Sequence, residues 1–151
     1  MTPERRDGPD SRHRAREVAL QMLYLWEVGG EDLDTVGRTY RQVRPGAADE
    51  ATEAAAMRLV RATALRLAEI DALIEARSAH WRIERMPVVD RAILRMAIGE
   101  FLAVPDTPRT VVINEALELA RTFSTEDAVK FINGVLDAIN HDLAAAGRSP
   151  A

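Results

Sequence analysis

A cluster of basic side chains opens an amphipathic segment, SRHRAREVALQMLYLWEV, which runs from Ser11 to Val28. The first two turns of this segment hold Arg12, His13, Arg14 and Arg16. Arg12 and Arg16 are four residues apart, which places them on one face of a helix. A cation near a helix N-terminus costs roughly 0.3–1 kcal/mol, because the helix dipole is positive there. An anion from outside the protein would offset this cost, and guanidinium groups bind phosphate through paired hydrogen bonds.

An aromatic residue, Tyr24, follows the basic cluster two turns after Arg16. If its ring is exposed, it can stack on a nucleobase; if it is half-buried, it belongs to the core. Basic side chains beside an aromatic ring are typical of proteins that bind single-stranded RNA. The alternative is that the arginines form only a solvated surface, because 19 of the 20 basic residues are Arg, as a GC-rich genome would produce.

Charge is distributed unevenly along the chain. The net charge is −4, yet residues 1–16 carry +2 and the remaining residues carry −6. The acidic remainder limits indiscriminate binding to nucleic acid and suits a basic protein partner.

Residues typical of catalytic and metal sites are few. The chain has no Cys, and its three histidines are far apart, so we expect no metal and no cofactor. Neither a glycine-rich phosphate loop nor a nucleophile elbow is present. Glu115 and Glu118 are three residues apart, a spacing typical of the solvated face of a helix. We therefore expect a binding protein rather than an enzyme.

The apolar segments are too short for a membrane protein. The longest uncharged run near the front, Val18 to Trp26, has nine residues, whereas a membrane-spanning helix needs about 20. The polar residues that precede it do not resemble a signal peptide. We therefore expect a cytoplasmic protein without membrane association.

Hydrophobic periodicity predicts an all-α fold of about six or seven helices with short joints, in two groups divided near residues 80–86. The prolines fall between periodic segments, and no segment alternates apolar and polar residues as a strand does. The expected helices span about 12–28, 33–43, 49–78 with a kink near 69–71, 87–103, 109–123 and 124–146. The expected organisation is a flexible basic leader at 1–11, one domain at 12–147 with subdomains at about 12–80 and 86–146, and a loose tail at 148–151.

Two glycines, Gly99 and Gly134, fall inside predicted helices. Each costs about 1 kcal/mol relative to Ala at such a position. Close contact between helices is the favoured explanation. The alternative is the close approach of a ligand or partner to the backbone.

Four stretches of the sequence, RHRAREVALQMLY, DRAILRMAIGEFLA, VVINEALELARTFS and KFINGVLD, resemble the NusB family of transcription antitermination factors. The resemblance extends from about Arg12 to Ile139, in order and with compatible spacing. It implies an all-helical fold of two packed bundles and no catalysis. It also implies binding to the boxA element of ribosomal RNA leader transcripts together with NusE, a small-subunit ribosomal protein, within the RNA polymerase antitermination complex.

The resemblance also implies which residues contact RNA. The positions that match the family's RNA-binding segments are Arg12, His13, Arg14, Arg16, Tyr24, Asp127, Lys130 and Phe131. His13 stands where the family often has another basic residue, which weakens the cluster at neutral pH.

The protein partner is expected at a different surface. Asp90 matches an acidic position that the resemblance turns toward NusE. The helix after Pro87 and the segment around Phe123 are the expected docking surface, because their sides away from the core would expose Leu, Phe and Ala. The candidate partner contacts are therefore Asp90, Arg91, Leu94 and Phe123. The family often has Gly at this joint, whereas Ser124 stands there in this sequence.

Two questions stay open at the level of sequence. Some family members dimerise, so a homodimer is possible and could cover the RNA surface. The alternative function is a helical adaptor that binds only protein, with its arginines in solvent.

Overall fold

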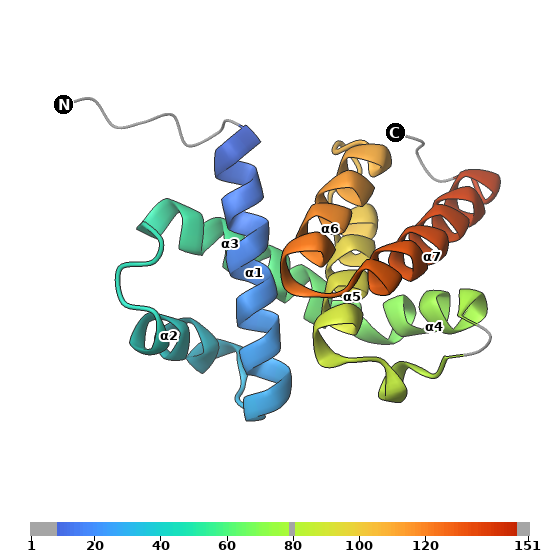
Figure 1. Ribbon diagram of the computed structural model, residues 1–151. Helices are drawn as coiled ribbons and strands as arrows, with labels where there is room; N and C mark the ends of the chain where they lie inside the picture. The colour runs from blue at the N-terminus through green and yellow to red at the C-terminus, as the bar shows by residue number, and fades with distance from the viewer. Residues whose placement is uncertain (1–8, 79–80, 148–151) are drawn as a thin grey trace. The chain divides into compact units, whose positions relative to one another are not determined.

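The structure is a computed structural model of the chain, and it describes residues 9–78 and 81–147 (Figure 1). These residues form seven α-helices and one short 3-10 helix and contain no strand, which confirms the predicted all-α fold. The elements are α1 (Pro9–Gly29), α2 (Leu33–Val43), α3 (Glu50–Leu65), α4 (Leu67–Arg77), η1 (Ile83–Arg85), α5 (Val88–Ala103), α6 (Arg109–Phe123) and α7 (Glu126–Ala145). Residues 1–8 of the predicted leader and the predicted tail at 148–151 lie outside the described residues.

Two helix boundaries differ most from those predicted. Helix α1 begins at Pro9 rather than Arg12, because the fixed φ of proline suits the first helical position. The long helical segment breaks at Arg66 (φ −108°, ψ 21°), between α3 and α4, rather than near 69–71. The Arg66 N–H donates to the Thr63 carbonyl at 3.2 Å, a tightened final turn that ends α3.

The chain divides into two compact units, and the division falls between Arg61 and Ala62, inside α3. In the first unit α1 packs against α2, and the Tyr40 hydroxyl donates to Gln21 Oε1 at 3.2 Å. In the second unit α5 contacts α4, α6 and α7. This division differs from the predicted boundary at 80–86, because α4 contacts α5 and α7 and therefore belongs with the second unit.

Helix α5 is the centre of the second unit, as its apolar sequence predicts, with ten of its 16 residues buried. A Cβ at Gly99 would lie 2.5 Å from Thr63 Oγ1 and 3.1 Å from Thr63 Cα, which confirms close helix contact as the reason for this glycine. The same explanation is wrong for Gly134 among the described residues. That glycine is exposed, and a Cβ there would meet nothing within 4 Å.

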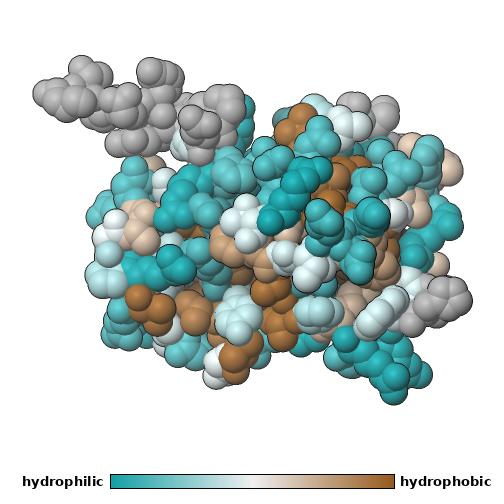
Figure 2. Space-filling view, in the orientation of Figure 1, coloured by the Kyte–Doolittle hydropathy of each residue, from teal (hydrophilic) through white to brown (hydrophobic). Residues whose placement is uncertain are grey.

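The face of the molecule in Figure 2 is mainly hydrophilic, with apolar residues in small groups. Over the described ranges, the exposed large hydrophobic residues are Tyr24, Val28, Val43, Leu65, Trp81, Val104 and Val111. No helix in this part of the chain is long and apolar enough to cross a membrane. Within the same residues, His, Cys, Asp and Glu side chains form no group of three that could hold a metal ion.

Candidate functional site

The basic start of α1, by which we mean Arg12, His13, Arg14 and Arg16, lies in the first unit and is only partly exposed. Arg12 is exposed, His13 and Arg14 are half-buried, and Arg16 is only 7 % exposed. Arg12 and Arg16 are one turn apart on α1 as predicted, but only Arg12 is exposed. Arg16 lies one turn before Ala19 and Leu20, which are both buried, so this side of α1 belongs to the core.

Arg14 is already engaged within its own unit. Its guanidinium donates to Glu17 Oε1 at 2.6 Å and to the Ala47 carbonyl at 2.7 Å. These contacts anchor the loop before α3 to the first turns of α1. Of the three arginines, only Arg12 has an exposed side chain.

Tyr24 lies further along α1 and is 42 % exposed. This exposure agrees with the alternative in which the ring can contact a ligand. The neighbouring Met22 and Leu23 are buried, so they supply the packing that holds this part of the helix.

In the second unit, the residues predicted to contact a protein partner are largely buried. Leu94 is fully buried and Asp90 is 7 % exposed, so Leu94 offers no surface to a protein partner and Asp90 offers little. Arg91 is half-buried and donates to the Met86 carbonyl at 2.9 Å, and Phe123 is half-buried. The expectation that α5 exposes Leu, Phe and Ala is wrong, because α4, α6 and α7 contact this helix.

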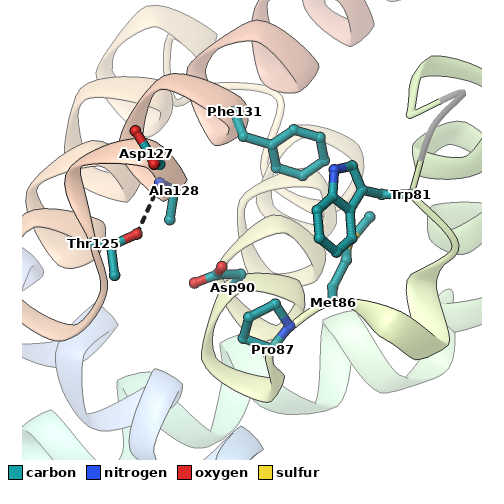
Figure 3. Close-up of a pocket in the computed structure, with 8 residues that line it drawn as sticks. All are labelled: Trp81, Met86, Pro87, Asp90, Thr125, Asp127, Ala128 and Phe131. Carbon is teal, nitrogen blue, oxygen red and sulfur yellow. Dashed lines mark hydrogen bonds between the residues drawn. The ribbon is translucent and has the colours of Figure 1, made fainter.

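A pocket of about 250 Å³ lies in the second unit, where the chain before α5 meets the starts of α5 and α7 (Figure 3). We call it the aspartate pocket. It is lined by Trp81, Met86, Pro87, Asp90, Thr125, Asp127, Ala128 and Phe131. The pocket therefore brings together Asp90, predicted to contact protein, with Asp127 and Phe131, predicted to contact RNA. Lys130, the third predicted RNA residue of α7, is exposed and does not line the pocket.

Hydrogen bonds fix the acidic side of the aspartate pocket. Thr125 caps α7, and its hydroxyl accepts from the Ala128 N–H at 3.1 Å. The Ser124 hydroxyl donates to Asp90 Oδ1 at 2.5 Å, which joins the start of α5 to the turn before α7. Asp127 is exposed in the first turn of α7, where a negative charge is favourable.

Trp81 is one of the lining residues of this pocket that the sequence analysis missed. Its side chain is 50 % exposed, and its ring centroid lies 6.5 Å from that of Phe131, with the planes tilted by 59°. The sequence did offer an indication: Trp81 lies in the connection before Pro87, outside the predicted helices, so no helix core accounts for a large apolar side chain there.

Comparison with known proteins identifies the family of the chain. The family model described as the NusB family matches residues 13–141. The transcription antitermination protein NusB of Koribacter versatilis is 46 % identical over 135 residues, which cover 89 % of this chain and 92 % of the relative. NusB of Solibacter usitatus is 42 % identical over 141 residues, covering 93 % and 96 %.

Solved structures with the same fold agree with this result. NusB of T. maritima has a TM-score of 0.75 and 33 % identity, covering 92 % of this chain and 93 % of the other. A chain from a crystal structure of antitermination factors NusB and NusE in complex with double-stranded RNA has a TM-score of 0.76 and 28 % identity. That match covers 87 % of this chain and 97 % of the other.

Proposed function

This chain belongs to the NusB family, and from that premise we propose that it is an RNA-binding transcription antitermination factor that acts together with NusE. Its RNA target is the boxA element of ribosomal RNA leader transcripts, and its site of action is the RNA polymerase antitermination complex in the cytoplasm. It performs no catalysis. The observation that carries this proposal is the family match over residues 13–141, supported by a related fold in a complex with NusE and RNA.

On the first unit, we propose that RNA lies along the exposed side of α1. Arg12 is exposed near the helix start and offers a guanidinium to a phosphate, and Tyr24 offers an exposed ring to a base. His13 and Arg14 are half-buried and contribute less. Arg16 acts as a structural residue of α1, because its side chain is buried.

The test is a titration of a boxA-containing RNA, with and without NusE, at two salt concentrations. Each phosphate contact with a single strand contributes about −0.7 to the slope of log affinity against log salt. Arg12→Ala should reduce that slope by about 0.7. Arg38→Ala is the matched control, because Arg38 is an exposed arginine of α2 outside the proposed site. Binding of NusE without any binding of RNA would instead support a protein-only adaptor.

A further inference from the structure

We propose that the exposed arginines along α2 and α3 form a second RNA-binding surface, which holds the phosphate backbone of the transcript beside the boxA element. We call this surface the α2–α3 arginine face, and its members are Arg38, Arg41, Arg44, Arg58 and Arg61. All five lie in the first unit, as α1 does. The inference rests on the proposed function in one respect, namely that α1 holds the boxA element itself.

Two ion pairs fix the register between α2 and α3. Arg41 Nη1 lies 2.7 Å from Glu53 Oε1, and Arg61 Nη2 lies 3.1 Å from Asp34 Oδ1. The later residue of α2 therefore pairs with the earlier residue of α3, so the two helices run in opposite directions along this edge. The stretch of each helix that lies between the two ion pairs runs alongside the corresponding stretch of the other.

Arg38 and Arg58 lie near the middle of these two stretches. Both side chains are exposed, and within the described residues neither makes a hydrogen bond or an ion pair. The exposed side chain of Arg44, at the C-cap of α2, also has no such partner in this part of the chain. Because Asp34 and Glu53 are already paired with the other two arginines, three guanidinium groups of the face keep their donors for a ligand.

Helix electrostatics account for only one end of this face. Arg41 and Arg44 lie at the C-terminal end of α2, where the helix dipole favours a cation. Arg38 and Arg58 are in the middle of their helices, where the dipole gives no such benefit. Each also lies three residues before another arginine of the face, and like charges on one side of a helix repel each other. Bound phosphates would relieve this repulsion.

Hydrogen bonds join the face to the basic start of α1. The Arg14 guanidinium donates to the Ala47 carbonyl at 2.7 Å, and the Ala47 N–H donates to the Arg44 carbonyl at 3.2 Å. Arg44 is therefore held close to the start of α1, and Arg41 and Arg38 extend the positive charge along α2. This continuity favours RNA over an acidic protein as the ligand, because one strand can contact α1 and the face together.

The face has no means of reading bases. Tyr40 is the one aromatic residue in α2 and α3, and it is buried. No ring of these helices is therefore available for stacking on a base. Contacts made by guanidinium groups alone are to phosphates, which carry no sequence information. We therefore expect the face to bind the transcript next to boxA whatever its sequence.

The direct test compares a short boxA RNA with the same RNA extended at either end by about ten uridines, a length within the site sizes of single-strand-binding domains. Fluorescence anisotropy should show tighter binding of at least one extended RNA. Two added phosphate contacts, by Arg38 and Arg58, should make the slope of log affinity against log salt more negative by about 1.4. The advantage of the extended RNA should therefore shrink about sevenfold between about 50 and 200 mM salt.

Three double variants test which side chains supply this advantage. Arg38→Ala/Arg58→Ala should remove it and leave the affinity for the short boxA RNA unchanged. Arg38→Lys/Arg58→Lys should keep most of the added salt dependence, because an ammonium group also neutralises a phosphate. Arg85→Ala/Arg121→Ala is the matched control, since it removes two exposed arginines of the second unit and should keep the full advantage. Circular dichroism checks that every variant remains helical.

Four results would overturn the inference. The extended RNAs could bind no more tightly than the short one, or the advantage could persist in Arg38→Ala/Arg58→Ala. That variant could also lose as much affinity for the short RNA as for the extended one, which would assign its arginines to the boxA site. Equal loss of the advantage in the matched control would reduce the effect to net charge. If polyglutamate binds through Arg38 and Arg58 while the extension gives no advantage, the face takes an acidic protein instead.

Failure of the proposed function gives a different result. A wild-type chain that binds no boxA RNA, with or without NusE, contradicts the proposed function. Oligouridine alone then tests the face. Weaker binding of oligouridine to Arg38→Ala/Arg58→Ala than to the wild type supports the inference, and equal binding overturns it.

Discussion

The basic start of α1 and the aspartate pocket carry opposite charges and are assembled in different ways. The basic start comes from one continuous stretch, and its charge is visible in the sequence. The pocket combines three stretches: the joint at Trp81 to Pro87, the first turn of α5, and residues 125–131 at the start of α7. In each site, only some of the charged side chains are accessible.

In both regions, burial determines which charged side chains can reach a ligand. Arg16 and Asp90 are each 7 % exposed, so each is held by its own unit. Arg12 and Asp127 are exposed near the N-termini of their helices. Each region therefore contains one buried charged side chain that maintains the structure and one exposed charged side chain that can contact a ligand.

The largest expected effect concerns a buried leucine of α5. Leu94 is one turn after Asp90 in α5 and is fully buried. Leu94→Ala should lower the free energy of unfolding by about 2–5 kcal/mol, because it removes buried methyl groups and leaves a cavity. Urea denaturation measures this change. Leu65→Ala is the control, because Leu65 is 85 % exposed and the substitution should cost less than about 0.5 kcal/mol.

The opposite result would restore the original prediction for Leu94. A Leu94→Ala variant with unchanged stability and weakened NusE binding would place this residue on the partner surface.

The next prediction distinguishes the buried Arg16 of α1 from the exposed Arg12. Arg16→Ala should lower the free energy of unfolding by about 1–3 kcal/mol, because it removes a buried polar group that interacts within the protein. Arg12→Ala should change stability by less than about 0.5 kcal/mol and weaken RNA binding. Thermal unfolding and RNA titration of both variants make the comparison. If Arg16→Ala keeps full stability and reduces the salt dependence of RNA binding, the division between the two arginines is wrong.

A third effect concerns the two sites together. If RNA binds the basic start and NusE binds elsewhere on the chain, and both partners also touch each other, one binding event makes the next effectively intramolecular. NusE should raise RNA affinity at least about tenfold, which is roughly 1.4 kcal/mol of coupling, and RNA should tighten NusE binding by the same factor. Calorimetry of all four steps of the cycle measures the coupling. A coupling factor near one would mean that the two sites act independently.

Local sequence patterns predicted the positions of the helices well, but they did not predict which side chains are exposed. The apolar circumference of the segment after Pro87 predicted a central helix, and the structure confirms it. For the same segment, Leu94 was wrongly predicted to be exposed to a partner, because sequence periodicity does not show which neighbouring helices cover it. The pocket could not be predicted as a unit, because Trp81 and Phe131 are 50 positions apart and their contact depends on tertiary packing.

The smallest expected effect uses a second acid of α7 as a reference for Asp127. Asp142 has its own internal partner: Arg77 Nε donates to Asp142 Oδ2 at 2.8 Å, and Arg77 Nη2 donates to Oδ1. These hydrogen bonds lower the pKa of Asp142 below its usual value of 3.8. A lowered pKa in the folded state stabilises the protein above pH 3.8, and this contribution is lost as the pH falls through the lowered value. The contribution is small, because the pair is solvated.

Asp142→Asn should therefore lower the thermal midpoint slightly at pH 7, and the difference from the wild type should shrink as the pH is lowered below 3.8. Scanning calorimetry across that range measures the difference, with Glu126→Gln as the control for removing an exposed acid from the same helix. Because Asp142 is already paired with Arg77 and does not line the pocket, its substitution should leave NusE affinity unchanged. If Asp142→Asn weakens NusE binding, the partner is attracted by the general acidity of α7. In that case the contrast between the acidic α7 and the basic start of α1 is one of net charge alone.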